Sequence, residues 1–155
     1  MKFENDELII VINELDKSTI RKNIVQVTTT TTNKLIIKHY NQIIQKIIRF
    51  DFRENNWPEL IPTIQELLNI KSEKCVLSGV STILQIGKIF EFETKAYQKP
   101  YIDALTIFFP ILTKLLNQIL PSFKLNDAAL IIKKVLDVYI TSIKVRIFKL
   151  QYYKI

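Results

Sequence analysis

The chain has 155 residues, 48% of them hydrophobic, which is enough to bury the core of one ordinary domain and excludes an intrinsically disordered chain. Its two glycines are too few for the turns of an all-β sandwich or barrel and for a glycine-rich phosphate loop, and its single cysteine excludes an internal disulfide. The net charge of +7 would suit nucleic acid or an acidic partner, but no basic cluster is dense or interleaved with aromatic residues, which favours lysines spread over solvated helix faces.

The sequence predicts neither a secretory signal nor a membrane span. Residues 1–7 are too acidic for a signal peptide and are not followed by its apolar core. The most apolar stretch, residues 101–120, includes Asp103 and Lys114, so we interpret it as a buried helix and expect no membrane partner. A lone cysteine fits a reducing compartment such as the cytosol or the nucleus.

The first third of the chain predicts two helices separated by a long loop. Apolar residues at helical spacing predict a helix over residues 6–15. Residues 17–33 are predicted as a loop with a threonine-rich insertion, because the run Thr28–Thr32 is β-branched and a lone strand would have no partner. A second helix is expected over residues 34–50, with Asn33 as its N-cap.

The remainder predicts four further helices. The third begins near Pro58, and the fourth follows Ser72 as its cap and reaches about residue 92. Gly79 and Gly87 lie inside the fourth helix, where we expect them to allow a neighbouring helix to approach closely. Pro100 opens a fifth helix that lasts to about residue 120 and is kinked at Pro110, and Asn126 caps a sixth that frays near Phe148.

Six helices in this order pair into three hairpins, at about 6–50, 57–92 and 100–148, within one unit spanning residues 1–155. The offsets are 44 residues from Trp57 to Tyr101 and 40 residues from Phe50 to Phe90. Both offsets fall in the period of about 40–47 residues of HEAT and armadillo repeats. We therefore predict an all-α fold, a HEAT-type α-solenoid of about three helical hairpins; a compact six-helix bundle is the rival architecture.

The residues that could carry chemistry do not form a catalytic pattern. His39 is the only histidine, which excludes a histidine-based metal cluster, and Cys75 is expected to pack as a small apolar side chain. Carboxylate pairs such as Asp51 and Glu54 lie at helix ends, where caps and surface roles are common. We therefore predict a binding protein, not an enzyme, with no metal and no cofactor.

Three sequence segments resemble importin-β-type nuclear transport receptors. In residues 50–62, Asp51-Phe52 followed by Trp57-Pro58-Glu59-Leu60-Ile61-Pro62 is similar to the helix–corner–helix segment of that family. Residues 80–92 are similar to its next inner helix, and residues 108–112 resemble its phenylalanine-proline-leucine outer helix. The set is similar to the importin seven/eight group over residues 5–155, with the threonine run as an insertion. Members are several times longer and begin with a further repeat, so the chain would correspond to an N-terminal-half segment.

The resemblance implies transport of proteins through the nuclear pore, hence a location in nucleus, cytoplasm and nuclear envelope. It implies Ran in its GTP form and phenylalanine-glycine nucleoporins as partners, with cargo bound mainly by parts outside this segment. Because import cargoes of this group are often basic, a segment of charge +7 would repel them. By helix position, the resemblance places Ran-contacting polar residues on the second and sixth helices: Lys38, Gln42, Gln45, Lys46, Arg49, Lys133, Lys134 and Asp137.

Two other functions remain open at the level of sequence. The chain could be a HEAT scaffold that joins proteins without Ran, or a basic helical protein that binds nucleic acid. Nucleic-acid binding is the weakest of the three functions considered, because it rests on net charge alone.

Overall fold

Helices form every regular element in the part of the chain that the computed structural model describes, residues 12–119 and 124–151. The prediction of an all-helical fold is therefore confirmed over these ranges. The elements are α1 Glu14–Val27, α2 Lys34–Ile47, a π-helical turn η1 Ile48–Phe52, α3 Leu60–Asn69, α4 Glu73–Phe90, α5 Lys95–Ile119 and α6 Leu125–Gln151.

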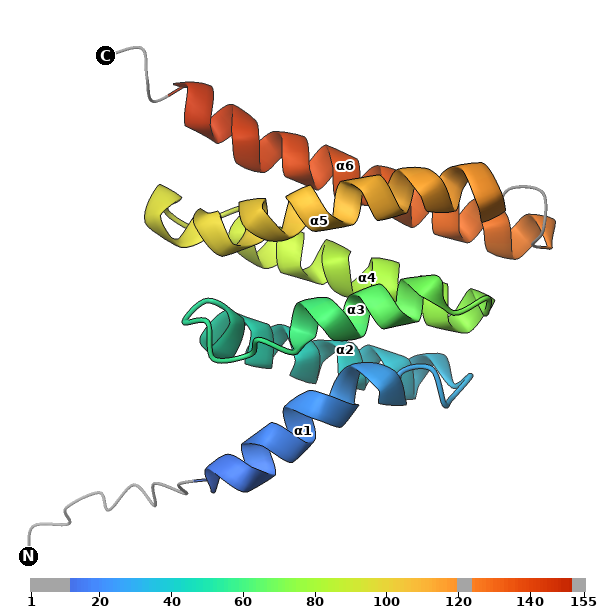
Figure 1. Cartoon of the computed structure of the whole chain (residues 1–155), viewed down its shortest axis with the longest axis horizontal. Helices are drawn as coiled ribbons and strands as arrows, with labels where there is room; N and C mark the ends of the chain where they lie inside the picture. Colours follow the sequence, from blue (N-terminus) through green and yellow to red (C-terminus); the bar gives the residue numbers. More distant parts are fainter. Residues whose placement is uncertain (1–11, 120–123, 152–155) are drawn as a thin grey trace, which may run out of the picture.

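Consecutive helices lie as pairs, and the pairs are stacked (Figure 1). The odd-numbered helices α1, α3 and α5 form one layer, and α2, α4 and α6 form the layer behind it. α4 lies at the centre and contacts every other helix, η1 included. The middle pair, α3 and α4, is consequently covered on both sides by its neighbours.

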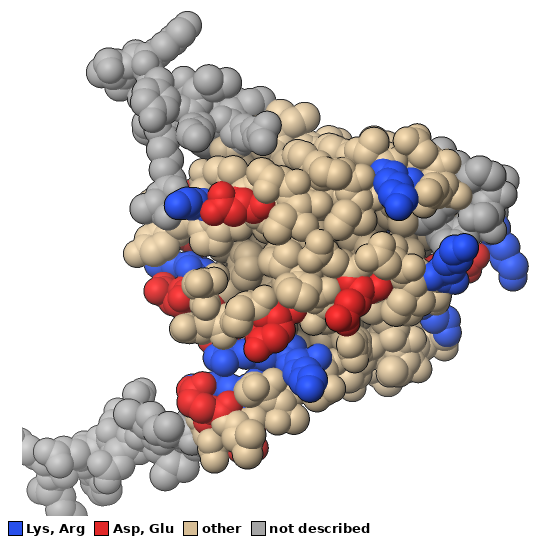
Figure 2. All heavy atoms as spheres, viewed as in Figure 1, with Lys and Arg blue, Asp and Glu red and all other residues tan. Residues whose placement is uncertain are grey.

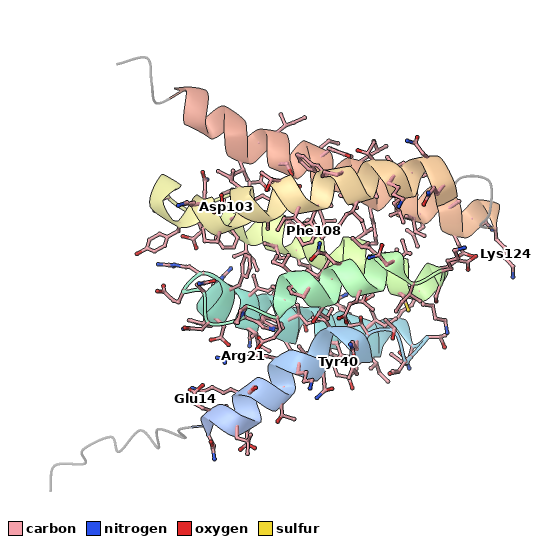
Figure 3. The ribbon with its side chains drawn as sticks, in the orientation of Figure 1. Glu14, Arg21, Tyr40, Asp103, Phe108 and Lys124 are labelled. Carbon is pink, nitrogen blue, oxygen red and sulfur yellow. The ribbon has the colours of Figure 1, made fainter. Side chains whose placement is uncertain are left out.

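Aromatic side chains from all three helix pairs meet in the core. Phe90 at the end of α4 contacts Phe52 of η1 edge-on and stacks on Tyr101 of α5, with ring centroids 5.9 Å apart in each case. Trp57, Phe90, Tyr101 and Phe108 are the largest fully buried side chains. Figure 3 shows Phe108 pointing from α5 into the stack. A continuous core therefore links the three pairs through the corner that holds Trp57.

Both glycines of α4 lie where another helix comes close, as the sequence predicts. A Cβ on Gly79 would be 3.0 Å from Leu68 Cδ2 of α3. A Cβ on Gly87 would be 2.6 Å from the Tyr101 hydroxyl of α5, closer than non-bonded atoms lie in folded proteins. Glycine at these two positions allows α4 to pack tightly against α3 on one side and α5 on another.

The predicted boundary between helix and loop in the first third is wrong. Residues 17–27 belong to α1, and only residues 28–33 form the connection to α2. The helix begins later than predicted because Asn13 caps it, accepting a hydrogen bond from the Leu15 N–H at 3.0 Å. It continues to Val27 because Ile24 and Val25 reach the core. Residues 6–11 of the predicted first helix lie outside the described residues.

The threonine run does end the helix. The hydroxyls of Thr28, Thr29 and Thr30 each donate to a carbonyl oxygen three residues earlier, at 2.7–2.8 Å. These local bonds satisfy the last carbonyls of α1 and compete with continued helix. The Asn33 cap of α2 is also confirmed, since its side chain accepts from the Leu35 and Ile36 N–H groups.

The other helix starts differ by a few residues. α5 starts at Lys95, so Pro100 lies inside it, because the Thr94 carbonyl accepts from the Tyr97 and Gln98 N–H groups and opens the helix earlier. The Lys124 carbonyl likewise starts α6 at Leu125, which puts Asn126 in the first turn. α3 starts at Leu60 and α6 continues past Phe148 to Gln151. Ser72 precedes α4, but its side chain makes no capping bond.

Candidate functional site

Four of the predicted site residues form one polar stripe, here called the α2 stripe, along α2 and the start of η1. Lys38, Gln42 and Gln45 lie on one side of α2 at spacings of four and three residues, Arg49 follows four residues later in η1, and all four are exposed. The Gln42 amide oxygen lies 3.3 Å from His39 Nδ1, a contact within the same helix. The stripe presents two cations and two amides to solvent and has the composition of a polar docking surface.

Lys46 lies at the edge of that stripe. It follows Gln42 by four residues, is exposed, and borders the groove described below.

The three predicted site residues of α6 do lie together, and Lys88 of α4 joins them. Lys133 is exposed, whereas Lys134 and Asp137 are half-buried. Burial lowers the pKa of Lys134, the neighbouring charges of Lys88 and Lys133 lower it further, and Asp137 partly offsets them. Three ammonium groups around one carboxylate leave a local excess of positive charge that an acidic surface would neutralise.

Sequence reasoning missed Lys88, although a signal for it exists. The residue lies in the last turn of α4, one turn before the end of a pattern that is otherwise apolar. Because α4 and α6 occupy the same layer, an exposed lysine on α4 is placed toward the lysines of α6. If the even-numbered helices are assumed to share one layer, Lys88 is expected to lie near the predicted site residues of α6.

The α2 stripe and the α6 cluster are two separate surfaces. α4 lies between α2 and α6 in the stack (Figure 1). A single small ligand cannot contact both, whereas a folded partner that lies along the layer of even-numbered helices can.

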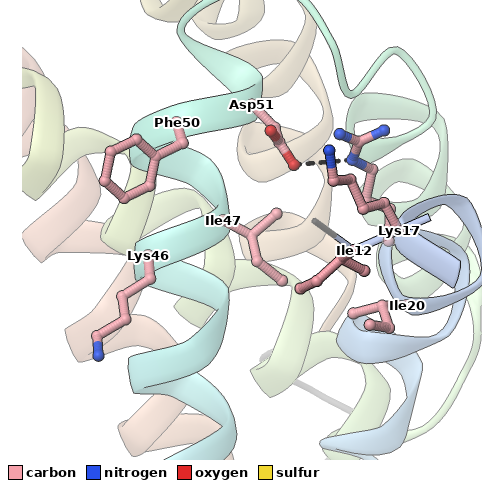
Figure 4. A pocket seen from close by; sticks show the side chains of 8 residues that line it. Ile12, Lys17, Ile20, Lys46, Ile47, Phe50 and Asp51 are labelled. Atoms are coloured by element: carbon pink, nitrogen blue, oxygen red, sulfur yellow. Dashed lines mark hydrogen bonds and ion pairs between the residues drawn. The ribbon is translucent and has the colours of Figure 1, made fainter. Parts of the chain in front are cut away.

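A third feature is a groove between α1 and the region where α2 continues into η1. Its volume is about 250 Å³. Ile12 and Ile47 approach each other across it, and the Arg21 guanidinium bonds to Asp51 at 2.8 Å on one wall (Figure 4). The hydrogen bond to Asp51 raises the pKa of Arg21, so the guanidinium group of this pair stays protonated. The lining residues are Ile12, Lys17, Ile20, Arg21, Lys46, Ile47, Phe50 and Asp51.

The corner between the pairs carries a further set of polar contacts. The Arg53 guanidinium carbon lies 3.7 Å from the centre of the Tyr97 ring, and Arg53 Nη1 lies 3.6 Å from a Glu93 oxygen. Lys144 of α6 contacts Glu91 at 3.2 Å. These side-chain contacts hold the ends of neighbouring helices together, so their role is structural rather than catalytic.

Charge on the face formed by the odd-numbered helices is mixed. Figure 2 shows Lys and Arg side chains interspersed with Asp and Glu over a surface that is mostly uncharged. The excess of cations in the sequence is therefore not gathered into one basic field on the face that is visible there.

Among the described residues, His, Cys, Asp and Glu side chains do not gather in groups of three or more that could hold a metal ion. Within the same ranges, no helix is long and apolar enough to cross a membrane. Cys75 is a half-buried free thiol that packs against the core, as predicted.

Comparison with known proteins points in one direction. The chain is 28% identical to human importin-8 over 110 residues, which cover 71% of the chain and 10% of importin-8. It is 26% identical to mouse importin-8 over 128 residues, which cover 83% of the chain and 12% of that protein. No protein-family model and no solved structure matches the chain. The chain is thus similar to importin-8 along a helical segment that spans about a tenth of that protein's length.

Proposed function

We propose that this chain is a HEAT-type solenoid segment of a nuclear transport receptor of the importin-β family, and that it supports Ran-regulated import of proteins into the nucleus. The observation that carries the proposal is the similarity to importin-8 across most of the chain, over helices that pair in chain order. On this proposal the chain works in the nucleus and the cytoplasm and at the nuclear pore, and it binds partners without catalysing a reaction.

The stacking of helix pairs supports the solenoid. Each pair has an apolar surface that it cannot bury alone, and the central helix α4 is covered only because pairs lie on both sides of it. Leu136, Ile140 and Ile143 of α6 remain more than half exposed on the last pair. A compact bundle would turn such side chains inward, whereas a solenoid leaves them on its end faces.

The polar surfaces of the even-numbered helices supply the proposed Ran contacts. The α2 stripe contributes Lys38 and Arg49, and the α6 cluster contributes Lys133 and Lys134, now joined by Lys88. The two surfaces present cations, so they would take acidic patches of Ran. Basic cargo would bind elsewhere in a longer receptor, and phenylalanine-glycine nucleoporins would use apolar surface of the segment.

The test is a binding assay with Ran locked in its GTP form. We expect GTP-dependent binding that falls about tenfold in the double variant Lys133→Glu/Lys134→Glu, because charge reversal replaces attraction by repulsion. Lys114→Glu, on α5 in the other layer, is the matched control and should leave the affinity unchanged. Binding that is absent, or equal for the GTP and GDP forms, contradicts the proposal.

A Ran-independent HEAT scaffold is the second candidate, and the exposed apolar side chains on α6 favour it. It predicts capture of a protein partner that is insensitive to Ran and its nucleotide. The net charge of +7 also leaves nucleic-acid binding to be tested. That function predicts an affinity for DNA or RNA that falls steeply with salt. If the protein does not shift DNA or RNA at low salt, this function is excluded.

A further inference from the structure

The exposed charged side chains that the structure describes on the even-numbered helices are all lysines. α2 carries three exposed lysines and contains no acidic residue. α4 adds Lys74 and Lys88, and α6 adds Lys133 and Lys144. Lys74 and Lys88 are fourteen residues apart, close to a whole number of helical turns, so they project from the same side of α4. Lysines therefore point into solvent from three neighbouring helices of one layer (Figure 1).

The carboxylates of this layer are less exposed than its lysines. Glu73 of α4, Glu91 directly after that helix, and Asp127 and Asp137 of α6 are all half-buried. Glu91 is already paired, since its Oε1 lies 3.2 Å from Lys144 Nζ. Asp137 lies among the lysines of the α6 cluster and offsets only part of their charge. The even-numbered helices therefore expose positive charge that their own carboxylates do not neutralise.

The layer of odd-numbered helices has a different surface. Exposed carboxylates occur on each of its helices, as Glu14 and Asp16 on α1, Glu66 on α3 and Asp103 on α5. Exposed lysines lie among them, and Figure 2 shows the two charges interspersed on this face. Exposed charge is thus divided unequally between the two layers, although the sequence itself shows only a net charge of +7.

The even-numbered helices suit an acidic polypeptide better than a nucleic acid. Single strands bind such basic surfaces by stacking their bases on exposed aromatic rings. The aromatic side chains described on these helices, Tyr40, Phe90 and Tyr139, are half-buried or buried. Apolar side chains lie among the lysines instead, with Leu130 43% exposed and Leu77 half-buried. A surface of this kind is complementary to a segment that carries carboxylates together with apolar side chains.

We propose that the layer of even-numbered helices is a binding face for an acidic segment of another protein, which crosses α2, α4 and α6. Packed helices lie about 8–10 Å apart, so the distance from α2 to α6 is about 20 Å, which about six or seven extended residues span. Carboxylates of the segment pair with lysines from each of the three helices. This binding needs no nucleotide switch, so the proposal is independent of Ran-regulated import.

The test is fluorescence anisotropy at low salt, with a labelled oligoglutamate peptide of about ten residues that is long enough to cross the layer. The triple variant Lys38→Ala/Lys88→Ala/Lys133→Ala, called the even-layer triple, removes one exposed lysine from each even-numbered helix. We expect the wild type to bind the peptide and the even-layer triple to bind it about tenfold more weakly, because three charge pairs are lost. No binding of the peptide by the wild type overturns the proposal, even if Ran binds.

The matched control removes the same charge from the other layer. Lys22→Ala/Lys99→Ala/Lys114→Ala replaces exposed lysines of α1 and α5, and should weaken binding by less than about twofold, because screening limits the reach of their charge. An equal loss in the two triples would show that net charge and not the face controls binding, which overturns the proposal. If a triple does not fold, its three single variants replace it, and each even-layer variant should lose about twofold.

A parallel titration with duplex DNA distinguishes the class of partner. Duplex DNA that binds more tightly than oligoglutamate, and loses the same affinity in the even-layer triple, would make this face a nucleic-acid site and overturn the proposal. Binding of oligoglutamate in the absence of Ran supports it, whatever the outcome of the assay with GTP-locked Ran.

Discussion

α4 and α1 differ in apolar content and in their place in the stack, and they differ in what holds them. Eleven of the eighteen residues of α4 are buried, against two of the fourteen residues of α1. α4 contacts helices of all three pairs, whereas α1 makes its main contacts with α2, α3 and α4 and leaves Leu15 and Ile20 exposed. The comparison shows that an apolar sequence and a central position in the stack together give α4 the larger buried surface, and tertiary packing supplies most of a helix's stability.

Polar contacts take the place of burial in α1. Its Arg21 bonds to Asp51 at 2.8 Å, and the Thr28 hydroxyl at its end contacts the Ser78 hydroxyl of α4. In α4 the same kind of group is fully enclosed, since Thr82 donates to the Ser78 carbonyl at 2.9 Å. A helix at the end of the stack is therefore positioned by a few specific bonds, and a central helix by packing on all sides.

The largest test of this comparison is truncation of the central aromatic ring. Phe90→Ala removes a fully buried ring that touches Phe52 and Tyr101, so we expect a loss of about 3–5 kcal/mol in the free energy of unfolding. Ile20→Ala in α1 is the matched truncation at an exposed site and should cost less than about 1 kcal/mol. Urea denaturation of both variants measures the difference, and similar losses would contradict the comparison.

The next effect concerns the close approach at Gly87. Gly87→Ala places a Cβ 2.6 Å from the Tyr101 hydroxyl, and overpacking of this kind costs about 1–3 kcal/mol. Tyr101→Phe removes the opposing oxygen, so the double variant should recover part of that loss. Additive losses in a double-mutant cycle would show that the clash does not depend on the hydroxyl, with the Thr141 methyl at 3.0 Å and the Tyr101 Cζ at 3.1 Å as the remaining contacts.

The smaller effect at neutral pH belongs to the first pair. Asp51→Asn keeps the shape of the side chain but removes the charge opposite Arg21, for which we expect a loss of about 1 kcal/mol because both groups are partly exposed. Glu54→Gln, whose contact with Arg53 is longer at 3.6 Å and more exposed, is the control and should cost less than about 0.5 kcal/mol. Thermal unfolding at low salt measures the loss of stability in both variants. Equal decreases in melting temperature would contradict the larger contribution expected of the Arg21–Asp51 bond.

Sequence reasoning predicts what depends on local patterns here. The Asn33 cap, the non-helical threonine run and the close approach at Gly79 and Gly87 all follow from side-chain chemistry and are confirmed. The start of α1 is missed because the apolar spacing continues through Asn13, and the cap that breaks it is visible only as a side-chain bond to Leu15. Local pattern could not show that a helix starts directly after Asn13.

The candidate site is recovered only in part for a related reason. Helical spacing places Lys38, Gln42, Gln45 and Arg49 on one stripe, but Lys88 joins Lys133 and Lys134 through the packing of α4 against α6. Contacts between helices depend on which side each presents to its neighbour, and one sequence does not specify that. The burial of Trp57 also depends on packing between helices. The sequence identifies Trp57 as a corner residue, and the structure shows that it is 1% exposed.

Alkaline pH offers the last way to sharpen the comparison, through Tyr101 in the central core. Burial raises the pKa of Tyr101, while its hydrogen bond with Ser142 at 3.0 Å works in the opposite direction. Below about pH 10 the phenol is neutral in folded and unfolded chains alike and contributes no pH dependence. Above it, the unfolded chain loses the proton first, so stability falls as the pH rises toward the folded pKa.

The comparison with Tyr101→Phe isolates this contribution, because the other tyrosines and lysines titrate in both proteins. At pH 7 the wild type should be more stable by about 1 kcal/mol, the ordinary value of one buried hydrogen bond. Between pH 10 and pH 11 that advantage should shrink, as measured by urea denaturation at each pH. An advantage that stays constant would mean that the folded and unfolded chains bind the phenol proton equally, which would contradict a pKa raised by burial in the central core.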